Sequence, residues 1–219
     1  MDTRTGYAAA ATLEDEATAR SLLVAGPDSR SDHGSARPSG GPAVQLHVTI
    51  DLPTDAQGAS RLLADPAYVH AKVRASGAVE QQVDVTGSAE DAFTVTTRRS
   101  LPTDQIPAHL RGFVGDRIDV RQVEAWEAPA ADGSRSGTVV VEIAGAPVRV
   151  TGRTSLVGVG PRATRVTYDG DVRAAVPLFA AAVEEAAGSA VRAALVTEET
   201  VAARWLADTA TDGTGASDR

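Results

Sequence analysis

The chain has 219 residues, a formal net charge of −8 and no cysteine. This length suits one domain with a tail or two very small domains, and the lack of cysteine excludes disulfides, thiol nucleophiles and cysteine-ligated metal. The acidic balance makes nucleic acid and anionic membranes poor partners.

Residues 1–42 differ in composition from the rest of the chain. The stretch GPDSRSDHGSARPSGGP, residues 26–42, has almost no apolar side chains and predicts a disordered or linker segment. A helix over residues 8–24 is possible but marginal alone. The N-terminus lacks the pattern of a signal peptide, and no stretch reaches the roughly 18 apolar residues of a membrane span. We therefore expect a cytoplasmic protein without integral membrane association.

The first element of the expected domain is a strand over residues 44–52, where apolar and polar residues alternate. Two short helices follow. Thr54 is expected to cap the first of them, with Gln57 three residues later completing a capping box. Asp65 is expected to cap the second, which has proline at its first position and ends at Gly77.

A series of strands with short turns comes next and predicts an antiparallel meander. The alternating segments cover residues 79–85, 93–101, 117–128, 138–145, 146–158 and 162–176. In the third of them, Ile118 and Val120 have the opposite parity to Val123 and Ala125, which predicts a β-bulge near Arg121.

The last predicted element is one long helix over residues 177–208, where apolar residues recur at helical spacing. We expect its sheet-facing side to be mostly alanine: Ala182, Ala186, Ala190 and Ala194. The predicted domain is therefore residues 43–208, followed by a disordered tail over 209–219.

This order resembles the START-like, helix-grip superfamily, in which a curved antiparallel sheet wraps around one long C-terminal helix. Segments such as DPAYVHAKVRASGA and VTTRRSLPTDQIPAHLRGFVGD resemble one family of it, an uncharacterised domain of high-GC Gram-positive bacteria. The resemblance covers residues 43–208. It implies an α+β fold with about seven strands, and it supplies no catalytic residues, because that family has no assigned activity.

A sheet curled around a helix leaves a space unless large side chains fill it, and aromatic residues make up only 4% of this chain. An unfilled apolar void costs about 24 cal/mol per Å³, so ~300 Å³ would cost about 7 kcal/mol. Two interpretations remain open. Either the small residues let helix and sheet approach closely, or a solvated or occupied pocket lies between them. In the second case residues 107–115 cap its mouth, with Leu110 and Phe113 over the opening.

Strand parity selects the candidate ligand-binding residues: Thr97, Arg99, Leu110, Phe113, Thr154, Tyr168, Phe179 and Val183. Tyr168 is expected to point inward and either orient a ligand or bond a backbone carbonyl. Arg99 either holds a ligand carboxylate or pairs with a carboxylate such as Asp104 or Asp116. His47 is expected to face solvent.

Three functions remain open at this stage. The first is a module that binds or carries a small hydrophobic or amphipathic molecule, lipid-like or polyketide-like. The second is an enzyme of the polyketide-cyclase or hydratase kind, and the third is a protein-interaction module. We expect no cofactor and no metal, since no spacing of His, Asp and Glu resembles a metal site, and we propose no catalytic residue.

Overall fold

The computed structural model describes residues 43–103, 117–144, 147–176 and 178–214. The chain divides into two units, Met1–Ser39 and Gly40–Arg219, and every described residue belongs to the second. The predicted N-terminal extension and the predicted cap with Leu110 and Phe113 lie outside the described residues. Within the described part of the chain, no helix is long and apolar enough to cross a membrane.

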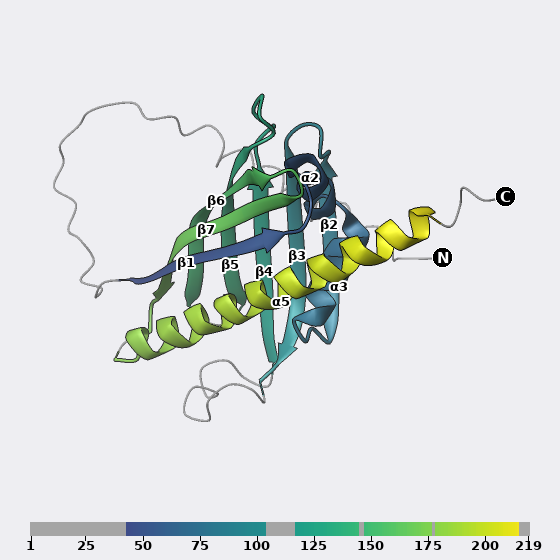
Figure 1. Cartoon of the computed structure of the whole chain (residues 1–219). Helices are drawn as coiled ribbons and strands as arrows, with labels where there is room; N and C mark the ends of the chain where they lie inside the picture. The colour runs from purple at the N-terminus through teal and green to yellow at the C-terminus, as the bar shows by residue number, and fades with distance from the viewer. Residues whose placement is uncertain (1–42, 104–116, 145–146, 177, 215–219) are drawn as a thin grey trace, which may run out of the picture. The chain divides into compact units, whose positions relative to one another are not determined.

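The predicted order of elements, one strand, two short helices, six strands and one long helix, is confirmed (Figure 1). The elements are β1 Val44–Leu52, α2 Ala56–Leu63, α3 Pro66–Ala75, β2 Glu80–Gly87, β3 Phe93–Pro102, β4 Arg117–Trp126, β5 Arg135–Ala144, β6 Val148–Gly160, β7 Ala163–Ala174 and α5 Ala180–Thr214. The strands form one antiparallel sheet in the order β1-β7-β6-β5-β4-β3-β2. The curved sheet and the long helix make the α+β helix-grip fold.

The two short helices carry the chain from one edge of the sheet to the other, from β1 to β2. Asp55, rather than the predicted Thr54, caps α2: its carboxylate accepts a hydrogen bond from the Gly58 amide at 2.7 Å. Thr54 is held outside the helix, because its carbonyl accepts from the Thr164 hydroxyl. Asp65 caps α3 as predicted, accepting from the Ala67 amide.

The long helix α5 packs against β1, β7, β6 and α3, and so covers what we call the inner face of the sheet (Figure 1). Its predicted alanine face is wrong, because Ala182 and Ala190 are exposed. The buried positions are Glu184, Gly188, Leu195, Glu198 and Ala202. Two of these buried positions are therefore glutamates, and Glu184 accepts from the Ala174 amide at 2.9 Å. The helix also continues to Thr214, beyond the predicted limit at residue 208.

The predicted bulge near Arg121 is also wrong. The register of β3 with β4 runs without a shift from Phe93 opposite Trp126 to Pro102 opposite Arg117. The inner face of β4 therefore carries Val120, Gln122, Glu124 and Trp126, while Val123 and Ala125 point the other way. The predicted bulge would have brought Val123 and Ala125 to the inner face, but the regular register places a charged residue, Glu124, there instead.

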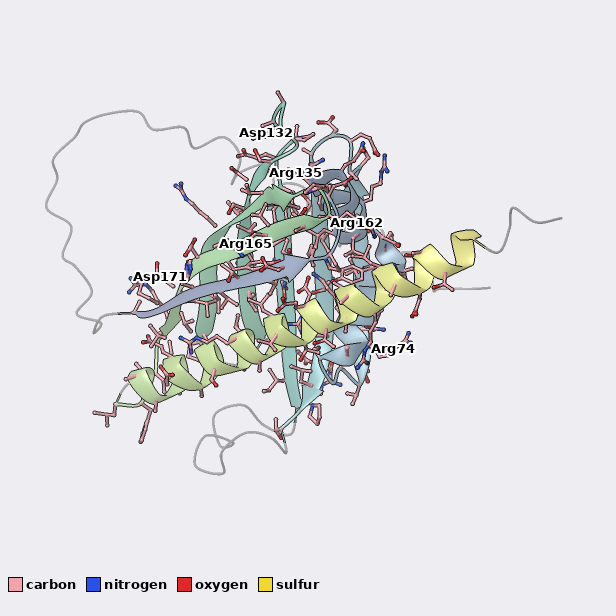
Figure 2. All side chains as sticks on the ribbon, viewed as in Figure 1. Arg74, Asp132, Arg135, Arg162, Arg165 and Asp171 are labelled. Carbon is pink, nitrogen blue, oxygen red and sulfur yellow. The ribbon has the colours of Figure 1, made fainter. Side chains whose placement is uncertain are left out.

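The opposite, outer face of the sheet carries polar cross-strand pairs between β1 and β7 (Figure 2). Arg165 donates to the Asp51 carboxylate at 2.8 and 3.0 Å, and the exposed His47 ring contacts Asp169. Such exposed pairs contribute little to stability. They account for the polar residues at every second position of β1 and β7.

A buried arginine joins the loops at one end of the sheet. Arg135 is only 4% exposed, and its guanidinium donates to Ser60 Oγ at 2.9 Å and to the carbonyls of Asp91 and Glu127 at 2.7 and 2.8 Å. It also lies over the Phe93 ring, 5.3 Å from the centroid. These bonds fix α2, the β2–β3 loop and the end of β4 to one another.

A pair of glycines lies at the centre of the inner face. Gly152 of β6 stands directly opposite Gly170 of β7. A Cβ at Gly152 would lie 2.5 Å from the carbonyl oxygen of Asp169, and one at Gly170 would lie 2.5 Å from that of Thr151. Only glycine therefore permits the close approach of the two strands here.

We predict that Gly152→Ala lowers the free energy of unfolding by roughly 1–3 kcal/mol, because the added methyl group overlaps the backbone of β7. Gly160→Ala in the same strand is the matched control, since a Cβ there would meet only the Ala163 Cβ at 3.6 Å. Urea denaturation of both variants measures the difference. Equal stabilities would contradict the assigned role of the glycine pair.

Candidate functional site

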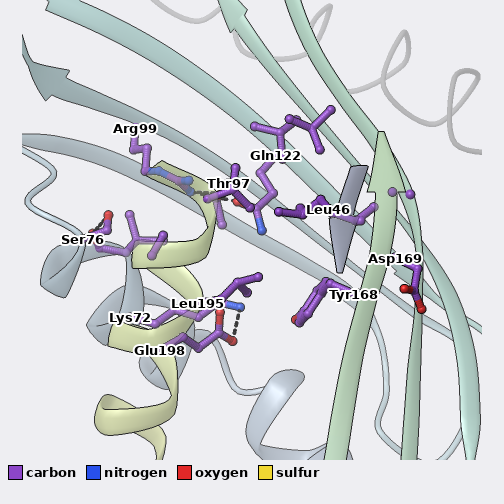
Figure 3. Close-up of a pocket in the computed structure, with 18 residues that line it drawn as sticks. Leu46, Lys72, Ser76, Thr97, Arg99, Gln122, Tyr168, Asp169, Leu195 and Glu198 are labelled. Carbon is purple, nitrogen blue, oxygen red and sulfur yellow. Dashed lines mark hydrogen bonds and ion pairs between the residues drawn. The ribbon is translucent and has the colours of Figure 1, made fainter. Parts of the chain in front are cut away.

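A cavity of about 70 Å³ lies between the inner face of the sheet and the helices α3 and α5 (Figure 3). Its apolar wall consists of Leu46, Val73, Val139, Val141, Val150, Val191, Ala194 and Leu195. Its polar wall consists of Lys72, Ser76, Thr97, Arg99, Gln122, Tyr168 and Glu198. Asp169 also borders it, although its side chain points away from the others (Figure 3).

The cavity is a consequence of small residues that face one another. Gly152 and Gly170 leave the centre of the sheet without side chains, and Ala194 lies on the helix that covers it. A volume of about 70 Å³ is far above the ~10–15 Å³ that one water needs and below the ~150 Å³ that holds benzene in an engineered cavity. The cavity is thus smaller than the ~300 Å³ void considered above, but helix and sheet do not pack closely enough to fill the space between them.

Three charged side chains meet at one end of this cavity, and all three are buried. The Lys72 ammonium of α3 lies 2.8 Å from a carboxylate oxygen of Glu198 on α5 and 3.5 Å from one of Glu124 on β4. Their side chains are 8%, 8% and 3% exposed. One lysine therefore bridges two carboxylates from opposite sides of the domain.

Polar side chains of the sheet extend this group along the cavity wall. Gln122 donates to Glu124 at 2.6 Å and accepts from an Arg99 Nη1 at 3.1 Å. The Tyr168 hydroxyl donates to the other oxygen of Glu124 at 3.5 Å. We call these residues the Lys72 cluster: Lys72, Arg99, Gln122, Glu124, Tyr168 and Glu198. The Arg99 Nε is buried and has no hydrogen-bond partner among the described residues.

Burial and mutual charge set the ionisation of the cluster. Burial alone would lower the pKa of Lys72, but the carboxylates of Glu124 and Glu198 outweigh it and raise the pKa above the ordinary value. Burial raises the pKa of Glu198, although Lys72 opposes the effect. Burial, together with the same two carboxylates, also raises the pKa of Tyr168. The lysine is therefore a fixed cation and the tyrosine a fixed hydrogen-bond donor.

The structure brings three of the predicted site residues together: Thr97, Arg99 and Tyr168 all border the cavity. Arg99 Nη1 also donates to Thr97 Oγ1 at 3.4 Å. The Tyr168 hydroxyl bonds to Glu124 rather than to a backbone carbonyl, and its contact with a ligand stays a prediction. Asp104 and Asp116, the carboxylates expected to pair with Arg99, lie outside the described residues.

The other described candidates lie away from the cavity wall. Thr154 is buried opposite Tyr168 in the sheet, and its hydroxyl has no partner in the described part of the chain. Val183 packs into a separate group of buried residues around Leu46 and Val172. Phe179 is 47% exposed, just before the start of α5. Ligand binding by these candidate residues stays a prediction.

Four residues of the site were not predicted from the sequence: Lys72, Gln122, Glu124 and Glu198. Two signals for them were present. Lys72 is the only lysine in the chain, and Glu124 shares its strand parity with Val120 and Trp126. Among the described residues, no group of three or more histidines and acidic residues is arranged to hold a metal ion.

Comparison with known proteins identifies the type of fold. A family model described as "Protein of unknown function (DUF2505)" matches residues 47–206. The structure of human STARD10 matches with a TM-score of 0.50 and 13% identity over 86% of this chain and 78% of that chain. No curated protein matches the chain.

Bacterial structures match with slightly lower scores. A START superfamily protein from Mycobacterium smegmatis has a TM-score of 0.46 and 15% identity, over 74% of this chain and 98% of that one. The Zhui aromatase/cyclase from Streptomyces sp. R1128 has a TM-score of 0.47 and 13% identity, over 74% and 92%. The match to human STARD10, together with the observed sheet and long C-terminal helix, shows a START-like fold, as the sequence predicted.

We predict that Lys72→Met destabilises the domain by about 3–5 kcal/mol at neutral pH, because two buried carboxylates lose their cation. Glu198 has a folded-state pKa above its unfolded value, and loss of Lys72 raises it further. Its contribution to stability is thus present at low pH and lost as the pH rises through that folded value. Urea denaturation should therefore show a smaller loss near pH 5 than near pH 8.

The double variant Lys72→Met, Glu198→Gln is the control for this prediction. It removes one positive and one negative charge, leaves Glu124 linked to Arg99 through Gln122, and should recover most of the lost stability, with little dependence on pH. A Lys72→Met variant whose loss is the same at both pH values would contradict the assigned charge balance.

Proposed function

Because this chain belongs to the DUF2505 family and has a START-like fold, we propose that the domain binds a small amphipathic molecule in the cavity between the sheet and α5. The role is that of a binding or carrier module. The proposal includes the cytoplasmic location and bacterial source expected from the sequence.

The observation that carries this proposal is the division of the cavity wall. Valines and leucines of β5, β6 and α5 form one part of it, among them Val139, Val150 and Leu195. Polar side chains form the other part, among them Arg99, Gln122 and Thr97. A hydrocarbon that binds against the apolar wall gains roughly 25 cal/mol for each Å² of apolar surface removed from water. The few polar groups fix the orientation of the ligand. An amphipathic molecule satisfies both parts.

The size of the cavity limits the ligand in its present state. About 70 Å³ accommodates a short alkyl chain or part of a ring. A larger lipid-like or polyketide-like molecule requires the side chains of the wall to move apart. The predicted cap residues Leu110 and Phe113 remain part of this proposal, as do Phe179, Val183 and Thr154, as candidates for the entrance and the surrounding shell.

One observation favours the enzyme alternative: Lys72, Tyr168 and Glu198 all border the cavity. A general base must exchange a proton near the working pH. Lys72 is unsuited to this because its pKa is raised, which leaves Glu198 as the exchangeable group. With one such residue and a tyrosine donor, a cyclase or hydratase-like reaction is the second candidate function. We propose it after the carrier.

We predict that Ala194→Leu weakens binding of 1-octanol about tenfold or more, because the larger side chain occupies the cavity. Ala193→Leu is the matched control, since Ala193 is the next residue of the same helix and is exposed. Isothermal titration calorimetry of the full chain measures both, and thermal melts verify folding. Undiminished binding by Ala194→Leu would place the binding site elsewhere.

We predict that Arg99→Ala weakens retention of a copurifying amphipathic molecule, detected by native mass spectrometry, while Tyr168→Phe has a smaller effect. Arg99 borders the cavity and its buried Nε has no partner among the described residues, whereas Tyr168 already donates to Glu124. Loss of substrate turnover in either variant, with ligand retention unchanged, would favour the enzyme instead. No effect on either property would favour the protein-interaction module.

A further inference from the structure

The Lys72 cluster holds an equal number of positive and negative formal charges. Lys72 and Arg99 are the cations, and Glu124 and Glu198 are the anions. Lys72, Glu124 and Glu198 are buried, and Arg99 is half-buried beside them, so an added charge in this group is costly unless it is balanced within it. Arg99 alone extends along the wall from the buried carboxylates, through Gln122, toward Thr97. Its Nε has no partner among the described residues.

We propose that the ligand carries an anionic head group that binds at Arg99, and that Glu198 takes up a proton when this ligand binds. The inference rests on the proposed function and names the chemical class of the ligand. A carboxylate, phosphate or sulfonate satisfies it equally, since each offers oxygen acceptors to a guanidinium.

The charge balance explains why a proton must accompany the anion. An anion at Arg99 adds one negative charge to a buried group whose charges already cancel. The cost of an unpaired buried charge is high, and a carboxylate that accepts a proton removes it. The site then contains two cations, one carboxylate and one anionic ligand, and is again neutral.

The hydrogen bonds select Glu198 as the proton acceptor. The carboxylate oxygens of Glu124 already accept from three donors, Gln122, Lys72 and Tyr168. For Glu198, the structure shows one donor, Lys72. Glu198 also borders the cavity, so the added charge acts on it directly. Burial already raises its pKa, which places it closest to protonation.

The other groups that face Glu198 hold their charge states. From α3 these are Lys72 and Tyr68, and the pKa of each is raised, for Tyr68 by burial and then by the two glutamates. From β7 it is Tyr168, with a raised pKa. From β3 it is Arg99, which remains a cation although burial lowers its pKa. β1, β5 and β6 contribute apolar side chains and glycine to the wall.

Calorimetry with two probes of equal chain length tests the proposal. The full chain is titrated with octanesulfonate and with 1-octanol between about pH 5 and 8, in buffers of different ionisation enthalpy. A sulfonate does not titrate in this range, so any proton uptake belongs to the protein. We expect uptake of up to one proton per octanesulfonate bound, with affinity rising by up to about tenfold for each unit the pH falls. Binding of 1-octanol should take up no proton.

Two variants assign the groups. Glu198→Gln should bind octanesulfonate without proton uptake, and Arg99→Gln should lose octanesulfonate binding while keeping 1-octanol. Octanesulfonate binding to the unmodified chain without proton uptake overturns the inference, and so does binding of 1-octanol alone; the proposed function survives both results. Failure of both probes to bind overturns the proposed function as well. The measurement on the unmodified chain decides the question even if a variant does not fold.

Discussion

One ammonium group between two carboxylates governs how the helices meet the sheet. Lys72 comes from α3, Glu124 from β4 and Glu198 from α5, and none of the three side chains is more than 8% exposed. A buried ion pair adds little net stability compared with apolar packing, yet separating its members is costly. The arrangement therefore restricts the positions that α3 and α5 can take over the inner face. Through Gln122 it also fixes the place of Arg99 in the cavity wall.

Most of the fold was predictable because the strands alternate regularly. In β1 and β7 the apolar parity follows the buried face without exception, and the outer positions carry pairs such as Arg165 with Asp51. Two of the errors, the bulge in β4 and the alanine face of α5, have one cause. Both predictions followed the apolar residues alone, whereas Glu124 and Glu198 are buried beside a lysine that lies far away in the sequence. A residue pattern shows polarity, and it does not show which charges have partners.

The candidate site was predictable only where it lies on strands. Thr97, Arg99 and Tyr168 follow from period-two parity, which assigns a face without knowledge of the neighbours. Lys72 and Glu198 lie on helices whose orientation is set by contacts with other elements. Each side chain can be buried only because it forms an ion pair with the other, and the sequence does not show that pairing. The cavity itself results from absent side chains, Gly152 and Gly170. The predicted meander makes their two strands neighbours, but the register that sets Gly152 opposite Gly170 does not follow from the sequence pattern.

The distance along the chain between the charged partners has a consequence for how the domain forms. Lys72 and Glu198 are separated by 126 positions, and α5 is the last described element. If the sheet and α3 form before α5 packs on them, Lys72 and Glu124 are buried without Glu198. Closure of so long a loop is entropically slow. Packing of α5 is therefore the step that brings Glu198 to Lys72 and balances the buried charges. The folding rate should then respond to substitutions in the middle turns of α5 more than to substitutions at its ends.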